Sequence, residues 1–231
     1  NGITVSQTTH GTSSVLIQVS FGCVAQSPSV SITPTTIWVK PGNAASLSAQ
    51  ITNRDAAGCS ATTFQLSASN TTGGTSTVTP ASTSVAPGQG TSASITVAGI
   101  SSSGTFTLTV KDSDGVDPSH SSDGQGTAQI AVDGTAPSAP TNLFSALVTK
   151  GVKLTWSSAS DSGGSGVATY YVYRNGAKIG ATTSLSYTDS TGTSGTTYTY
   201  TVTSVDGVGY ESGNSNSTTI TTKSSKGGKP R

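Results

Sequence analysis

The chain has 231 residues and a formal net charge of +1, and only 9% of its residues are charged, against about a quarter in an average soluble domain. This composition supplies no basic face or stripe of the kind that nucleic-acid binding needs, and no apolar run approaches the roughly 18 residues of a membrane-spanning helix. Because Val, Ile and Thr are plentiful and net charge is low, we expect a folded all-β protein and not a disordered Ser/Thr/Gly-rich chain.

The first predicted strands cover residues 3–7 and 15–21. In the second of these, alternation places four apolar side chains in one row: Val15, Ile17, Val19 and Phe21. Such a row can fill pockets along an open sheet edge of another molecule, as in strand donation. The segment therefore predicts either pairing between copies of the chain, which would build a filament, or pairing within its own chain, which we favour.

The sequence contains two cysteines, Cys23 and Cys59. An even number of cysteines in an exported β protein favours one disulfide, and two unpaired buried thiols are the alternative. The chain has no Met and starts at Asn1, which we interpret as a processed chain whose export signal has been removed. These features predict a secreted protein, located outside the cell or on its surface.

Trp38 lies in Ile37-Trp-Val39, where alternation makes it point away from both neighbours. Either Trp38 or its neighbours therefore face solvent. Secreted bacterial sandwiches often carry aromatic platforms for polysaccharides, so Trp38 is a candidate ligand platform. A position in the core is the alternative, and we favour it.

Further alternating stretches predict strands through the rest of the first half, at residues 30–32, 37–40, 47–52, 64–68, 92–97, 106–110 and 128–132. Turn signals such as Lys40-Pro-Gly-Asn43 and Ala86-Pro-Gly-Gln89 separate them. Short strands punctuated this regularly predict an antiparallel β-sandwich.

One loop in this half concentrates four carboxylates: Asp112, Asp114, Asp117 and Asp123. Ca²⁺ favours six to eight oxygen ligands from such residues, which makes the loop a candidate calcium site. Its spacing matches an EF-hand loop only partly, because the glycine comes two positions early and no glutamate closes the loop. A solvated acidic loop is the alternative that we favour, so we expect no cofactor.

The second half contains predicted strands at residues 143–148, 152–156, 169–173, 177–179, 185–188, 197–205 and 218–222. Asn175-Gly176 stands between two alternating runs, and this pair tolerates the positive φ angles of a two-residue hairpin turn. We therefore expect a tight hairpin at this point.

The segments Ala136-Pro-Ser-Ala-Pro140, Val152-Lys-Leu-Thr-Trp156 and Thr197-Tyr-Thr-Tyr200 resemble those of a bacterial fibronectin type III domain over residues 136–222. The resemblance implies that Trp156 lies in the core. It also implies that Tyr198 is the corner tyrosine, which hydrogen-bonds back to an upstream loop.

The first half is similar to an immunoglobulin-like accessory domain that precedes fibronectin type III modules in secreted bacterial hydrolases such as gametolysin-like metalloproteases. The similarity rests on Cys23, Pro28-Ser-Val-Ser-Ile-Thr-Pro34, Lys40-Pro-Gly42, Cys59 and Val85-Ala-Pro-Gly88. It implies that residues 1–22 are the last strands before that module and that any catalytic part lies elsewhere.

The sequence shows no group of residues typical of a catalytic site. A hydrolytic triad needs a placed base, and the sequence offers only His10 and His120, which stand in turn-like or loop segments where we expect them to face solvent. No His-Glu-x-x-His motif is present, and Glu211 is the single glutamate. We therefore expect that the chain is not an enzyme.

Together these observations predict two tandem antiparallel β-sandwiches. The expected parts are an N-terminal strand segment (1–22), an immunoglobulin-like domain (23–134), a fibronectin type III domain (135–222) and a basic Gly/Lys tail (223–231). The predicted function is a non-catalytic extracellular interaction and spacer module that contacts a protein or polysaccharide. The alternative is a self-assembling subunit of a surface filament.

Overall fold

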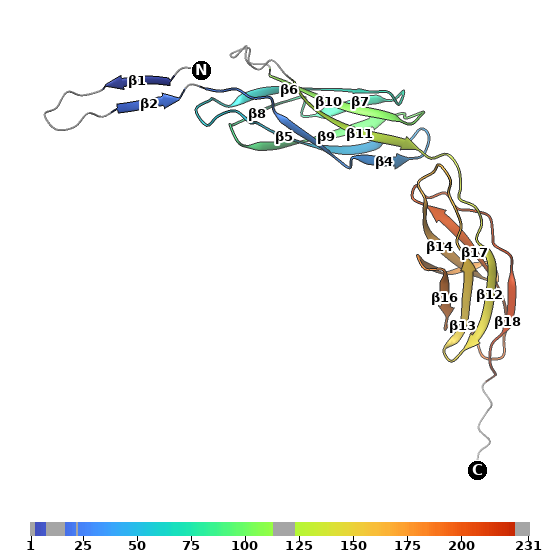
Figure 1. The fold of residues 1–231 in the computed structure, drawn as a ribbon. Helices are drawn as coiled ribbons and strands as arrows, with labels where there is room; N and C mark the ends of the chain where they lie inside the picture. The colour runs from blue at the N-terminus through green and yellow to red at the C-terminus, as the bar shows by residue number, and fades with distance from the viewer. Residues whose placement is uncertain (1–2, 8–16, 22, 113–122, 225–231) are drawn as a thin grey trace. The chain divides into compact units, whose positions relative to one another are not determined.

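The computed structural model describes residues 3–7, 17–21, 23–112 and 123–224 (Figure 1). The chain divides into two compact units, Asn1–Val132 and Asp133–Arg231. Each unit has its own cluster of buried apolar side chains. All the secondary-structure elements in the described ranges are β-strands, so the all-β prediction is confirmed. These ranges contain no helix that is long and apolar enough to cross a membrane.

The first unit begins with a two-stranded antiparallel ladder of β1 (Ile3–Gln7) and β2 (Ile17–Phe21), in which Val5 pairs with Val19. Two larger sheets follow. One has the order β3 (Ser29–Thr33), β5 (Ala45–Thr52), β9 (Gly90–Ala98) and β7 (Thr75–Thr79). The other has the order β4 (Thr36–Val39), β11 (Gly124–Val132), β10 (Gly104–Asp112), β6 (Thr62–Asn70) and β8 (Ser82–Val85).

Alternation in the strands builds the core of the first unit. In β5, the side chains of Ala45, Leu47, Ala49 and Ile51 are buried, and the serines and the glutamine between them are exposed. Because successive side chains point to opposite faces of a sheet, one strand contributes to the core and to a hydroxyl-rich surface at the same time. The predicted sandwich is confirmed with one exception: β4 pairs with β11 in parallel.

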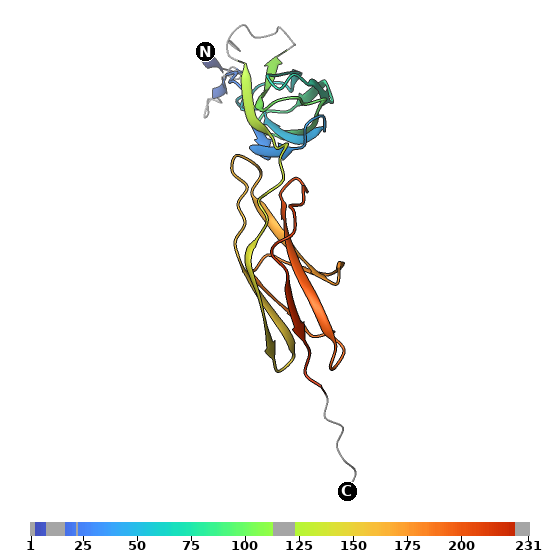
Figure 2. The same cartoon turned by 90° about the vertical axis from the view of Figure 1, so that its right-hand side faces the viewer.

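The second unit packs a sheet of three strands against a sheet of four. The first contains β12 (Thr141–Val148), β13 (Gly151–Ser157) and β16 (Ser186–Asp189). The second has the order β15 (Ala177–Thr182), β14 (Val167–Arg174), β17 (Thr197–Asp206) and β18 (Thr218–Thr221). Figure 2 shows these strands of the second unit from the side.

Aromatic residues fill the core between these two sheets. Trp156 is buried, as predicted, and its ring meets that of Tyr170 edge-on at 5.6 Å between centroids. Tyr198 accepts a hydrogen bond from the backbone N–H of Thr193 at 2.9 Å, which confirms its predicted role as a corner tyrosine. Asn175 and Gly176 have φ angles of 49° and 81°, so the predicted tight hairpin is also confirmed.

Candidate binding surfaces and metal-binding residues

Trp38 lies on the surface of the first unit, with 37% of its side chain exposed. Its neighbour Val39 is buried, and Ile37 packs against the same core. Alternation along β4 therefore turns Trp38 outward, and the favoured core position was wrong. The sequence pattern fits either orientation because Ile37, Trp38 and Val39 are all apolar, so alternation does not indicate which side faces the core. The role of Trp38 as a ligand platform stays a prediction.

The acidic loop is described only at its ends. Asp112 is the last residue of β10, and the carboxylate of Asp123 lies 3.5 Å from the ammonium group of Lys111. Asp114 and Asp117 fall outside the described residues, as do His10 and His120. A calcium site in this loop therefore stays a prediction.

The N-terminal segment forms its strand pairing within the chain. Ile17, Val19 and Phe21 belong to β2, which runs antiparallel to β1, whereas Val15 lies outside the described residues. One edge of β2 is thus already paired with a strand of the same chain. Donation of this strand to another copy stays a prediction.

The two cysteines form a disulfide between Cys23 and Cys59, with an S–S distance of 2.05 Å, as predicted. A hydrogen bond also joins the same two segments: the backbone N–H of Gln26 donates to the carboxylate of Asp55 at 2.8 Å. The disulfide therefore fastens the chain before β3 to the loop after β5. Its role is structural.

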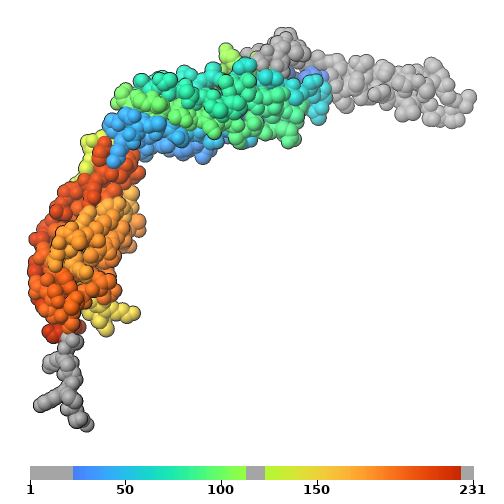
Figure 3. All heavy atoms as spheres, turned by 180° about the vertical axis from the view of Figure 1, so that it is seen from behind, coloured from blue at the N-terminus to red at the C-terminus, as the bar shows by residue number. Residues whose placement is uncertain are grey.

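A second aromatic surface lies on the outer face of the four-stranded sheet, where the sequence predicted no binding residue. Tyr171 and Tyr173 alternate along β14 with the buried Tyr170 and Val172. The same alternation is visible in the sequence and would have indicated an outward position. The ammonium group of Lys178 lies over the Tyr171 ring, which is a cation–π contact. Figure 3 shows the surface that these later strands form, in orange and red.

Glu211 organises the polar part of this face. The hydroxyl groups of Tyr173 and Thr203 both donate to its Oε1 atom at 2.6 Å. The hydrogen bond to Glu211 raises the pKa of Tyr173. Burial acts to raise the pKa of Glu211, but the hydrogen bonds from Thr203 and Tyr173 and the charge of Lys178 outweigh it and lower that pKa. The face therefore combines two tyrosine rings, the Glu211 carboxylate with the two hydroxyl groups that donate to it, and the Lys178 side chain.

A buried ionic network joins the two sheets of the second unit. The guanidinium group of Arg174 and the hydroxyl of Tyr200 both donate to Oδ2 of Asp189 at 2.7 Å. Burial acts to raise the pKa of Asp189, but hydrogen bonds from Thr191, Tyr200 and Arg174 lower it. Carboxylates with shifted pKa values often occur in catalytic sites, yet here each hydrogen-bond donor connects one structural element to another. We assign this network to stability.

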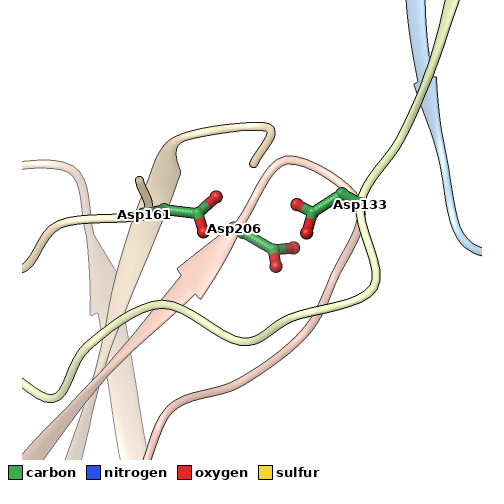
Figure 4. A group of neighbouring side chains, drawn as sticks. All are labelled: Asp133, Asp161 and Asp206. Carbon is green, nitrogen blue, oxygen red and sulfur yellow. The ribbon is translucent and has the colours of Figure 1, made fainter. Parts of the chain in front are cut away.

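Three further carboxylates of the second unit lie close together: those of Asp133, Asp161 and Asp206 (Figure 4). One ligand atom from each falls within 4.8 Å of the others. They come from the start of the unit, the turn after β13 and the end of β17. Among the described residues, these are the side chains grouped closely enough to hold a metal ion.

No family model matches the chain. Exoglucanase B of Cellulomonas fimi is 44% identical over 97 residues, which is 42% of this chain and 9% of that protein. Poly(3-hydroxybutyrate) depolymerase of Ralstonia pickettii is 45% identical over 92 residues, 39% of this chain and 18% of that protein. Chitinase 63 of Streptomyces plicatus is 41% identical over 96 residues, 41% of this chain and 15% of that protein. The chain thus spans less than a fifth of the length of these relatives.

Among solved structures, titin domains A168–A170 match with a TM-score of 0.48 at 17% identity, covering 90% of this chain and 71% of that one. The fibronectin(III)-like modules of Clostridium thermocellum CbhA match with a TM-score of 0.41 at 16% identity, covering 84% of this chain and 94% of that one. Both scores are low, so the fold assignment rests on the strand order described above. The second unit, in which a sheet of three strands packs against a sheet of four, has a fibronectin type III-like fold. An immunoglobulin-like accessory domain and a link to gametolysin-like metalloproteases stay predictions, because these relatives do not bear on them.

Proposed function

We propose that this chain is a non-catalytic module of a secreted polymer-degrading enzyme, in which it acts as a spacer and contacts the polymer through exposed aromatic side chains. One observation carries the proposal. Segments of 68 to 99 residues, 41% to 47% identical to this chain, occur in proteins named as an exoglucanase, a poly(3-hydroxybutyrate) depolymerase, an α-amylase and chitinases.

These names describe different reactions. The matched segment makes up only 7% to 18% of each protein, and about 100 residues is the size of one β-sandwich. A segment shared by enzymes of such different activity does not carry the chemistry specific to any one of them. It supports a task that all of them need, such as spacing two other parts of a long chain.

The described residues favour the same interpretation. Asp189, whose pKa is lowered, is fully engaged in joining two sheets, and Glu211 accepts hydrogen bonds from the hydroxyl groups of Tyr173 and Thr203. The disulfide supports a location outside the cell, where such bonds persist. We therefore expect the contact with a polymer to be made by surface groups and not by a catalytic pocket.

Two surfaces are suited to that contact. Trp38 in the first unit is exposed, and Tyr171 and Tyr173 in the second are partly exposed on the outer face of their sheet. Aromatic side chains combine an apolar ring with a polar end, and this combination suits a partner that has apolar faces and many hydroxyl groups. A polysaccharide is such a partner.

The test uses the full chain with insoluble cellulose, chitin, starch and poly(3-hydroxybutyrate) particles. We expect no soluble product, and we expect a fraction of the protein to sediment with the polysaccharides. The variants Trp38→Ala and Tyr171→Ala/Tyr173→Ala should each lower this fraction, and circular dichroism should show that each variant is still folded. Phe144→Ala is the matched control, because Phe144 is 63% exposed but lies outside both surfaces. Release of product, or wild-type protein that stays in solution with every polymer, would contradict the proposal.

The alternative function, a filament subunit joined by strand donation, gains no specific support, because β2 pairs with β1 of its own chain. Size-exclusion chromatography with light scattering separates the two functions. We expect one monomeric species whose mass does not change with protein concentration. Concentration-dependent growth into ordered assemblies would favour the filament instead.

A further inference from the structure

The three grouped aspartates lie at the ends of separate segments of the second unit. Asp133 is its first residue, Asp161 follows β13, and Asp206 ends β17. Figure 4 shows their carboxylates directed toward a common space. Because these segments are far apart in the sequence, the cluster is a product of the tertiary fold.

Two of the carboxylates are held in place by donors from the chain. Oδ2 of Asp133 accepts hydrogen bonds from the backbone N–H and the hydroxyl of Ser165, at 2.9 and 2.8 Å. Oδ2 of Asp161 accepts one from the N–H of Gly166 at 2.8 Å. Burial acts to raise the pKa of Asp133, but the hydrogen bonds from Ser165 and Thr135 lower it, so this group is negative at neutral pH.

Asp206 differs from the other two. Its side chain is only 3% exposed, and Oδ1 accepts hydrogen bonds from the N–H groups of Val208 and Tyr210, at 3.0 and 2.8 Å. Its second oxygen, Oδ2, is completely buried and has no hydrogen-bond partner. No described lysine or arginine forms an ion pair with any of the three carboxylates. A buried carboxylate oxygen without a partner is costly, so its presence indicates a group that binds there.

Gly164 leaves room for this arrangement. A Cβ atom at this position would lie 2.5 Å from both carboxylate oxygens of Asp161. Any other residue at this site would therefore push the Asp161 carboxylate out of its position. The turn accommodates the cluster because it carries a glycine here.

We propose that Asp133, Asp161 and Asp206 together bind one Ca²⁺ ion. Calcium takes oxygen ligands at 2.3–2.6 Å, so two ligands on opposite sides of the ion are about 5 Å apart, and separations within 4.8 Å fit one ion. Mg²⁺ holds its ligands more closely and keeps several waters, which suits three grouped carboxylates, two of them buried, less well. Backbone carbonyls and water would complete the coordination. Its three ligand residues differ from those of the calcium site predicted in the loop at residues 112–123.

The competing explanation is that no ion binds and that water alone occupies the space between the three carboxylates. The two explanations predict opposite responses to calcium, which makes them separable by experiment.

The experiment treats the full chain with EDTA and then titrates it with CaCl₂, by isothermal calorimetry and by differential scanning calorimetry. We expect one bound ion per chain and a transition of the second unit that moves to higher temperature with calcium. MgCl₂ should move it less. Asp206→Asn keeps the Oδ1 acceptor but removes the charge, and it should weaken calcium binding by at least about tenfold, since ligand charge sets affinity at such sites.

Gly164→Ala is a second variant, which displaces Asp161 without changing any charge. It should weaken calcium binding and leave the transition of the EDTA-treated chain nearly unchanged. Asp112→Asn and Asp123→Asn are controls and should bind calcium like the wild type. The proposal is overturned if the EDTA-treated wild type shows neither heat nor a shifted transition when calcium is added, as a cluster that holds only water requires. It is equally overturned if binding survives Asp206→Asn and is lost in Asp112→Asn.

Discussion

At the scale of single residues, Asp189 is a buried carboxylate that accepts hydrogen bonds from several donors. It ends β16 of the three-stranded sheet and accepts hydrogen bonds from Arg174 and Tyr200, which belong to β14 and β17 of the other sheet. Thr191 donates to the same carboxylate from its backbone and from its hydroxyl. The side chain is 1% exposed, so the charge is stable there only while these donors remain.

We predict that Asp189→Asn lowers the free energy of unfolding by about 3 kcal/mol, because it leaves the partly buried charge of Arg174 without its partner. Urea unfolding of the second unit measures this change. Glu211→Gln is the control, since Glu211 is an exposed carboxylate of the same unit, and surface charges of this kind contribute about 1 kcal/mol or less. Equal effects of the two substitutions would contradict the assignment.

The pH dependence of stability follows from the same residue. Although burial acts to raise it, the pKa of Asp189 in the folded protein lies below the ordinary value of 3.8. Its contribution is therefore fully present above pH 3.8 and is lost as the pH falls through the folded pKa. We predict that the free energy of unfolding of the wild type falls steeply below this pH and that Asp189→Asn flattens the decline. Identical slopes for the two proteins, measured by urea unfolding between neutral and acid pH, would refute this.

At the scale of secondary-structure elements, the hairpin of β14 and β15 depends on a backbone conformation that L-residues rarely adopt. Gly176 has a φ of 81°, and the space beyond its Cα is empty. We predict that Gly176→Ala lowers the free energy of unfolding by about 1 kcal/mol through backbone strain alone. Thermal unfolding by circular dichroism measures the change. Gly213→Ala is the control, because its site is equally open and its φ is not positive, and it should cost nothing.

At the scale of the whole molecule, the chain is two units, each with its own core. The disulfide between Cys23 and Cys59 lies in the first and has a sequence separation of 36 residues. In the chain-entropy model, closing a loop of this size contributes about 3–4 kcal/mol. We therefore predict that a reductant lowers the calorimetric transition of the first unit and leaves that of the second in place.

A double variant, Cys23→Ser/Cys59→Ser, is the control for this prediction. It should show the lowered first transition without reductant and no further response when reductant is added. A reductant that lowers both transitions together would mean that the two units unfold as one.

Local patterns were sufficient for much of the fold. The strands of the second unit, the Asn175-Gly176 turn and the core position of Trp156 follow from alternation and from turn chemistry, which act over a few neighbouring residues. The strands β7 and β8 were not predicted. Both are short edge strands composed largely of serine and threonine, with few apolar residues to mark one face.

Adjacent residues were enough to predict most of the strands, the place of the tight turn and the availability of two cysteines for one disulfide. The outward position of Trp38 and the parallel pairing of β4 with β11 became clear in the folded chain. The tertiary structure alone brought Asp133, Asp161 and Asp206 together. This is because the order of strands in a sheet brings together residues that are distant in the sequence. The alternation of side chains along one strand does not indicate which distant segments will lie beside it.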